Sequence, residues 1–207
     1  MKEIYEILIS ESEVILYESK FRGTRLRLAL VLLLVTGIRI SELLPLKLYQ
    51  IKTLFVEHWI EIDRAKRGPS NHKAFLTKEG ANIVRKRLSD LEIMSSYKTD
   101  NCYIFTAQGS NKPLDREAFN RIINQFIKKC ALKIPGKPNL KSHSFRIGFI
   151  TQLWRDTNDI EFVRQAIGHA KINTTSEYVE NLSDKERRSK MEQVKSPKDL
   201  VINLKNC

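Results

Sequence analysis

The 207-residue sequence has few residues that break regular structure, only 8 glycines and 6 prolines, and it has no internal repeat or low-complexity tract. Its longest apolar run, residues 28–35, is far shorter than the ~20 residues needed to span a bilayer. Charges are interleaved with apolar residues at the N-terminus, which is unlike a signal peptide. These absences predict a folded, soluble, intracellular protein and exclude disordered and membrane-spanning classes.

Cysteine and acidic residues are also scarce. Cys102, Cys130 and Cys207 are odd in number and scattered, so we expect reduced thiols rather than a disulfide framework or a zinc site. The chain has 36 Lys plus Arg against 24 Asp plus Glu, which gives a net charge of +12. A domain this basic usually binds a polyanion, most often nucleic acid, although a generally basic surface is the plainer alternative.

Apolar periodicity predicts helices at the start of the chain. An N-cap within residues 10–13 is expected to begin a first helix that ends near Gly23. Residues 24–35 form a second, largely buried helix, and Gly37 suits the left-handed residue that ends it.

Arg39 follows this buried helix at a predicted helix–turn–helix junction, where Ser41 can begin a short helix. An arginine that interrupts apolar sequence needs an anion to face. That anion is either a bound ligand or the nearby carboxylate of Glu42, and the segment alone favours neither.

Residues 54–63 alternate apolar and polar side chains, which predicts a strand, and residues 73–77 predict a returning strand. The cation-rich turn between them, residues 64–71, forms the tip of a small antiparallel hairpin. A Lys/Arg loop of this kind is most simply solvated surface. With the helical remainder, the fold class is mainly α with a small antiparallel β-sheet (α+β).

The later part of the chain has helical periodicity. Thr77 caps a predicted helix to about Leu91, and Asp115 begins an amphipathic helix to Leu132. Three short helices are then expected, beginning at Ser142 or Ser144, at Asp159, and at Thr174 or Thr175.

Those last helices contain an unusual set of side chains: His143, Arg146, His169 and Tyr178. There is no paired-carboxylate site, metal-ligand cluster or Walker-type loop, so no metal or cofactor is expected. Arginines donate bidentate hydrogen bonds to phosphate oxygens, and with a histidine they can stabilise a five-coordinate phosphorus. A tyrosine in such a cluster could act as a nucleophile if a base or a cationic field lowers the cost of ionising it.

From about residue 8 to residue 182, the chain resembles the catalytic domain of the tyrosine recombinase, or phage-type integrase, family. Residues 36–44, TGIRISELL, resemble the family's first arginine box and place its arginine at Arg39. The sequence from His143 to Arg146 resembles the His-x-x-Arg box. The Gly168–His169 pair is similar to the third box, and Tyr178 falls at the nucleophile's spacing.

The resemblance implies that Tyr178 attacks a DNA phosphodiester and forms a 3′-phosphotyrosyl link. It implies that Arg39, Arg146 and His169 hold the non-bridging oxygens and that His143 assists proton transfer or positioning. The family's catalytic lysine lies on a β-hairpin, and Lys66 in the basic tip matches it best as the general acid, with Lys73 as the alternative.

The resemblance also has departures. Ile147 stands where a second histidine often follows the arginine, and only about 38 residues precede Arg39, so we expect the N-terminal DNA-binding domain to be absent. We expect residues 1–182 to form the catalytic domain. Residues 183–207 would form a tail that docks on a neighbouring protomer of a homo-tetramer on double-stranded DNA. The chain would then be either an excised catalytic domain or a natural short form.

Two rival functions fit the same residues. A type IB topoisomerase shares the nucleophile and the cations, but the residues that make up the motifs favour a recombinase. A non-catalytic DNA-binding regulator would have little reason to retain every chemical position.

Overall fold

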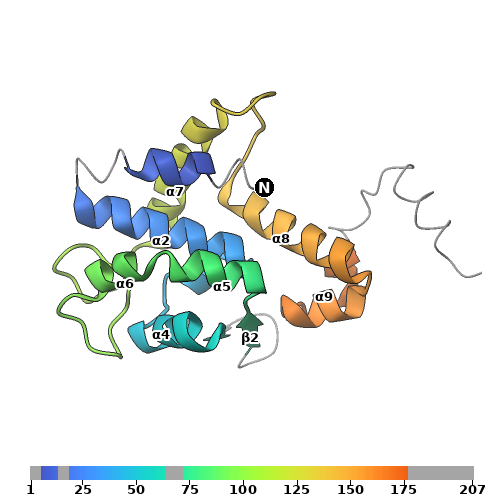
Figure 1. The fold of residues 1–207 in the computed structure, drawn as a ribbon, viewed down its shortest axis with the longest axis horizontal. Helices are drawn as coiled ribbons and strands as arrows, with labels where there is room; N and C mark the ends of the chain where they lie inside the picture. The colour runs from blue at the N-terminus through green and yellow to red at the C-terminus, as the bar shows by residue number, and fades with distance from the viewer. Residues whose placement is uncertain (1–5, 14–18, 64–71, 177–207) are drawn as a thin grey trace, which may run out of the picture.

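The computed structural model describes residues 6–13, 19–63 and 72–176. It is mainly helical with a two-stranded antiparallel sheet, so the predicted fold class is confirmed (Figure 1). Residues 6–13 are helical. The labelled elements are α2 (Lys20–Thr36), α3 (Ile40–Leu43), α4 (Leu48–Glu57), β1 (Trp59–Ile62), β2 (His72–Phe75), α5 (Lys78–Arg85), α6 (Leu88–Ser95), α7 (Arg116–Ala131), α8 (Ser142–Thr157), α9 (Ile160–Ala166) and α10 (Ile172–Ser176).

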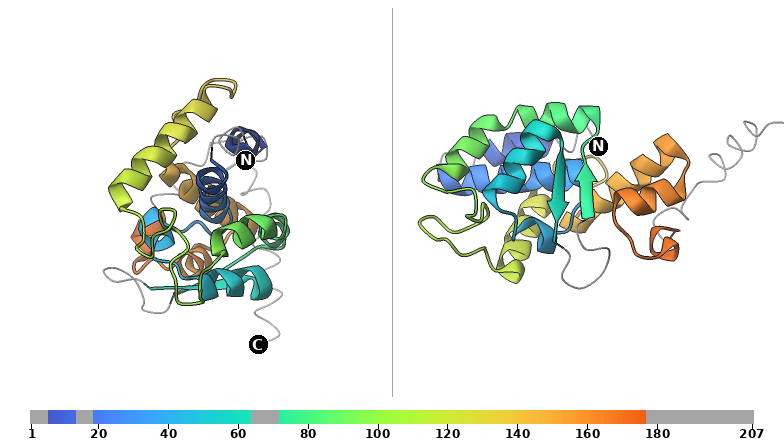
Figure 2. Two further views of the ribbon diagram at one scale, coloured as in Figure 1. Left: turned by 90° about the vertical axis from the view of Figure 1, so that its left-hand side faces the viewer. Right: turned by 90° about the horizontal axis from the view of Figure 1, so that it is seen from below.

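Helix α2 is the central element of the fold. It is buried along most of its length and packs against α5, α6 and α8, which surround it in the two further views (Figure 2). The guanidinium of Arg27, also buried, forms a bidentate ion pair with Asp90 of α6. Gly37 ends the helix with φ 63°, as predicted, and its N–H donates to the carbonyl of Leu33.

Two predictions about the first helices were wrong. Helix α2 begins at Lys20 rather than at residue 24, with Ser19 as its N-cap. Residues 10–13 lie inside the helix of residues 6–13 and do not cap a later one. The hydroxyl of Ser12 donates to the carbonyl of Ile9 at 2.6 Å, so this serine is satisfied within its own helix.

The predicted strand over residues 54–63 is half helix. Leu48, Ile51 and Leu54 are fully buried along one face of α4, and His58 ends the helix with φ 64°. The apparent alternation over residues 54–57 is therefore the end of a helical apolar face. That face begins at Leu48, before the segment that was predicted to be a strand. Only β1 is extended, and it pairs antiparallel with β2.

Helix boundaries in the second half follow the predicted caps closely. Asp115 accepts a hydrogen bond from the N–H of Ala118 at the start of α7, and Asp159 accepts one from Phe162 at the start of α9. The single helix predicted from Thr77 to Leu91 is two helices, because the chain turns at Arg87 and brings α6 against α2. Thr77 caps the first of them, so β2 ends before it.

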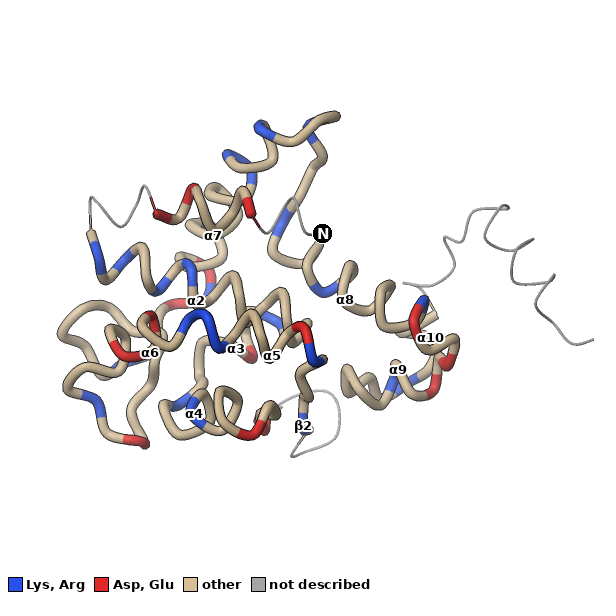
Figure 3. Tube along the Cα trace, viewed as in Figure 1, with Lys and Arg blue, Asp and Glu red and all other residues tan. Residues whose placement is uncertain are grey.

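Charge is unevenly distributed over the fold. Figure 3 shows Lys and Arg along the connection between α7 and α8, where Lys133 pairs with Glu11 at 2.6 Å. Cys102 and Cys130 are free thiols, and burial raises the pKa of Cys130 to about 11. Cys207 lies outside the described residues. Within the described ranges, no helix is long and apolar enough to cross a bilayer.

Candidate active site

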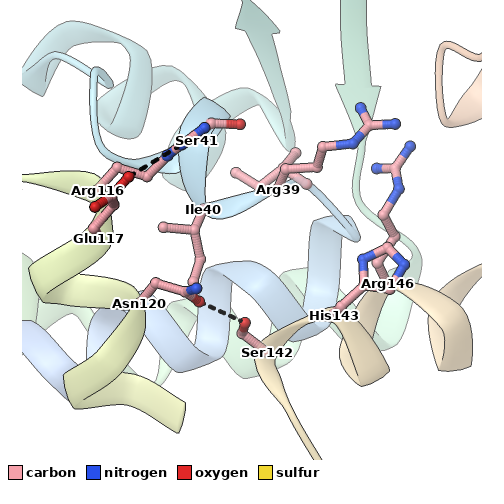
Figure 4. A pocket seen from close by; sticks show the side chains of 10 residues that line it. Arg39, Ile40, Ser41, Arg116, Glu117, Asn120, Ser142, His143 and Arg146 are labelled. Atoms are coloured by element: carbon pink, nitrogen blue, oxygen red, sulfur yellow. Dashed lines mark hydrogen bonds and ion pairs between the residues drawn. The ribbon is translucent and has the colours of Figure 1, made fainter.

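A cleft of about 440 Å³ opens between α3, α7 and the first turns of α8 (Figure 4). It contains three of the predicted site residues, Arg39, His143 and Arg146, whose side chains extend toward the same end of it. The other residues lining it are Ile38, Ile40, Ser41, Arg116, Glu117, Asn120 and Ser142.

Arg39 is the N-cap of α3, directly after the turn that ends α2. Glu42 is its partner: one carboxylate oxygen accepts the backbone N–H of Arg39 at 2.8 Å, and the other accepts from Nη1 at 3.0 Å. The Glu42 side chain is 9% exposed, whereas that of Arg39 is 39% exposed. The structure therefore shows the Glu42 alternative, and a bound anion at Arg39 stays a prediction; the buried carboxylate fixes the guanidinium and leaves part of it open to the cleft.

Arg146 is buried, with 2% of its surface exposed. Its Nη1 donates to the carbonyl of Gly37 at 2.6 Å, and Nη2 donates to the carbonyl of Ile167 at 3.3 Å. The guanidinium thus connects the end of α2 to the end of α9. A side chain at Gly37 would disturb this junction, since a Cβ there would lie 2.6 Å from Cδ1 of Phe149.

His169 follows Gly168, which has φ 63° just beyond the end of α9, as predicted. Its Nε2 lies 3.0 Å from Nη2 of Arg146, and its Nδ1 lies 3.1 Å from the hydroxyl oxygen of Thr175. The imidazole is 3% exposed. The prediction that this helix begins at Thr174 or Thr175 was wrong, because α10 already begins at Ile172.

The backbone of His169 is also held. Its carbonyl accepts from Nη1 of Arg164 at 2.8 Å, and Arg164 forms a bidentate pair with Glu161. The hydrogen bonds from Arg164 lower the pKa of Glu161 to about 2, and that pairing raises the pKa of Arg164. This ion pair therefore stays charged at neutral pH and anchors the turn that carries the histidine.

His143 lies at the start of α8, beside Arg146 in the cleft. Burial lowers its pKa, and the charges of Arg146 and Arg39 lower it further. The imidazole is therefore mainly in its neutral form at pH 7.

Lys141 is the N-cap of helix α8, and its backbone N–H donates to the hydroxyl oxygen of Ser144 at 3.1 Å. Two amides of α7 add to this cap: Oδ1 of Asn124 accepts the N–H of Ser142 at 2.7 Å, and Oδ1 of Asn120 accepts the hydroxyl of Ser142 at 3.2 Å (Figure 4). These amides hold the turn that presents His143 and Arg146, and neither was predicted from the sequence.

Two predicted site residues, Lys66 and Tyr178, lie outside the described residues, as does the predicted tail, residues 183–207. Lys73, the alternative lysine, is exposed on β2, where its Nζ lies 4.3 Å from the ring centroid of Trp59. It is not among the residues that line the cleft.

Chemically, the cleft places the guanidinium groups of Arg39 and Arg146 beside the neutral imidazole of His143, and a second imidazole, that of His169, supports Arg146. Guanidinium groups held by fixed acceptors are suited to binding a tetrahedral oxyanion such as a phosphate. No group of three or more His, Cys, Asp or Glu side chains that could hold a metal ion occurs in the described part of the chain.

Several known proteins are similar to this chain. It is 28% identical over 178 residues to a tyrosine recombinase of Agathobacter rectalis, covering 83% of this chain and 49% of the relative. It is 26% identical over 166 residues to the tyrosine recombinase XerD of Brucella suis, covering 80% of this chain and 51% of the relative. The chain thus spans about half the length of the curated relatives it matches.

Solved structures share the fold. The crystal structure of XerA recombinase matches 93% of this chain and 63% of its own, with a TM-score of 0.68 and 26% identity. The Tn1549 transposon integrase in complex with transposon right-end DNA matches 91% of this chain and 63% of its own, with a TM-score of 0.63. At 20% identity the second match concerns the fold alone.

The model of the phage integrase family matches residues 4–185, which is most of the chain. With Arg39, His143 and Arg146 at one cleft and His169 in contact with Arg146, the chain belongs to the phage integrase family.

Proposed function

We propose that this chain is the catalytic part of a site-specific DNA recombinase that cleaves and rejoins strands through a covalent 3′-phosphotyrosyl intermediate. The observation that supports this best is the convergence of Arg39, His143, Arg146 and His169 from three separate segments of the chain. The recombinase and integrase names of the similar proteins support the same reaction.

In the proposed reaction, the phenolic oxygen of Tyr178 attacks the phosphorus and the bond from phosphorus to the 5′-oxygen breaks. Arg39 and Arg146 neutralise the non-bridging oxygens, with His169 supporting Arg146. The neutral imidazole of His143 accepts the phenolic proton, and Lys66 gives a proton to the leaving 5′-oxygen. Rejoining reverses these steps, so the ester conserves the energy of the broken bond and no nucleotide is consumed.

We also propose that double-stranded DNA is the substrate and that a homo-tetramer assembles on it inside the cell. Residues 1–182 would be the catalytic unit and residues 183–207 would dock on a neighbouring protomer. Deleting residues 183–207 should then abolish the slow-migrating assembly on a two-site DNA, measured by native electrophoresis. Unchanged assembly would reject this role for the tail.

The central test is formation of a covalent adduct with a nicked suicide DNA substrate. Wild-type protein should form an adduct that resists denaturation, and Tyr178→Phe should form none while binding the DNA equally well. If wild type binds the DNA but forms no adduct on any candidate site, the chain is a regulator rather than an enzyme. Relaxation of supercoiled plasmids of any sequence would instead favour a type IB topoisomerase.

The general acid has its own test. A substrate with a 5′-bridging phosphorothiolate has a sulfur leaving group that needs no proton. This substrate should restore cleavage by Lys66→Ala. If it restores Lys73→Ala instead, the general acid lies on β2 and our assignment of Lys66 is wrong.

A further inference from the structure

The contact between Arg146 and His169 determines where the imidazole carries its proton. Arginine nitrogens only donate hydrogen bonds, and Nη2 of Arg146 lies 3.0 Å from Nε2 of His169. The imidazole Nε2 must therefore be the acceptor and be unprotonated. In a neutral imidazole the proton is then on Nδ1.

The hydroxyl oxygen of Thr175 is within reach of that proton. Nδ1 of His169 lies 3.1 Å from Oγ1 of Thr175, whose residue is fully buried in α10. A hydroxyl oxygen accepts readily, so the Nδ1–H of His169 donates to Thr175. The two hydrogen bonds form one directed series from Arg146 through His169 to Thr175.

We propose that Thr175 is a positioning residue: it accepts the Nδ1–H of His169, keeps the ring turned with Nε2 toward Arg146, and so holds the guanidinium of Arg146. The proposal rests on the proposed function only for its kinetic consequence, since the orientation of the ring is a property of the DNA-free protein. Thr175 also lies three residues before Tyr178 in the sequence, so the same contact ties the histidine to the segment that leads to the proposed nucleophile.

Removing the hydroxyl has a defined effect. In Thr175→Val, the shape of the side chain is nearly kept, but the buried Nδ1–H loses its acceptor. Arg146 still requires an unprotonated Nε2, so the proton stays on Nδ1, but nothing in α10 then holds the ring in its orientation. Arg146 is in turn held less firmly against the phosphate.

The direct test is a long-range ¹⁵N correlation spectrum of the DNA-free protein at pH 8, which separates protonated from unprotonated ring nitrogens. The chain has 4 histidines, and the loss of one ring pattern in His169→Asn assigns the resonances. Wild type and Thr175→Ser should show His169 protonated on Nδ1. Thr175→Val should shift the resonance of the protonated Nδ1 away from its wild-type position, because its hydrogen bond is lost, whereas Thr174→Val, a control on the same helix, should not.

The kinetic test uses adduct formation at saturating nicked DNA. Thr175→Val should slow it by about tenfold or more, the usual cost of losing a partner that orients a functional histidine. DNA affinity should stay close to wild type, and Thr175→Ser should restore most of the rate.

Two results would overturn the proposal: wild-type His169 protonated on Nε2, or a Thr175→Val spectrum that matches wild type even if cleavage slows. The expected spectra without any wild-type adduct would support the role of Thr175 in holding Arg146 and would reject the proposed function. The two failures are therefore distinguishable.

Discussion

His143 is the residue whose protonation the site controls most clearly. Burial first, and then the charges of Arg146 and Arg39, lower its pKa. The unfolded chain therefore binds this proton at a higher pH than the folded chain does, so acidifying below about 6.5 destabilises the fold through this group.

The prediction concerns the NMR titration of His143 in the DNA-free protein. Its midpoint should lie below the ordinary histidine value, and Arg39→Gln should raise it, because removing a nearby positive charge favours the imidazolium. Arg116 lines the same cleft but does not contribute to lowering the pKa of His143, so Arg116→Gln should leave the midpoint unchanged. No change in Arg39→Gln would contradict the placement of these two side chains.

Glu42 supports the site by accepting two hydrogen bonds from Arg39. Glu42→Ala should lower the free energy of unfolding by about 1–2 kcal/mol, because the N–H at the start of α3 and the guanidinium both lose their acceptor. Glu42→Gln keeps an oxygen that can accept the N–H of Arg39, so its free energy of unfolding should fall less than that of Glu42→Ala. Chemical denaturation measures both, and equal losses would show that charge rather than capping dominates.

At the scale of the elements, the caps Asp115 and Asp159 were predictable and helix α4 was not. Asp115 and Asp159 begin helices as expected because an N-cap is a local interaction. Helix α4 was mistaken for a strand because its apolar face is evident only when Leu48 and Ile51 are counted with Leu54.

The site was predictable in a similarly uneven way. Resemblance to a family placed Arg39, His143, Arg146 and His169, and the structure brings these side chains to one place. Lys66 and Tyr178 remain predictions. The supporting contacts of Asn124 and Thr175 could not be found, because each is an ordinary polar residue until a distant segment folds against it.

The junction at Gly37 gives a prediction for these elements. Gly37→Ala should lower the free energy of unfolding by about 2–4 kcal/mol. The new Cβ would clash with Phe149, and alanine would be strained in the left-handed backbone conformation of this position. Gly109→Ala is the matched control: its φ is 75° but nothing lies within 4 Å of the added carbon, so it should cost about 1 kcal/mol. Urea midpoints compare the two, and equal costs would mean that Phe149 moves aside freely.

On the scale of the whole molecule, the net charge of +12 predicts DNA binding that weakens steeply with salt. Arg116 lines the cleft with an exposed side chain, so Arg116→Ala should reduce the slope of log Kd against log salt by about one. Lys52 pairs with Asp100 and does not line the cleft, so Lys52→Ala should leave the slope unchanged. Fluorescence anisotropy across a salt series measures both, and equal slopes in the two variants would place the DNA elsewhere.

The burial of α2 has a consequence for how the chain is made. Its partners α5, α6 and α8 follow it in the sequence, and α8, the last of the three, ends at Thr157. At translation rates of about 5–20 residues per second, α2 leaves the ribosome on the order of 10 s before α8. During that interval the apolar face of α2 that α8 later covers is exposed, and a chaperone that binds apolar helices would meet that face first.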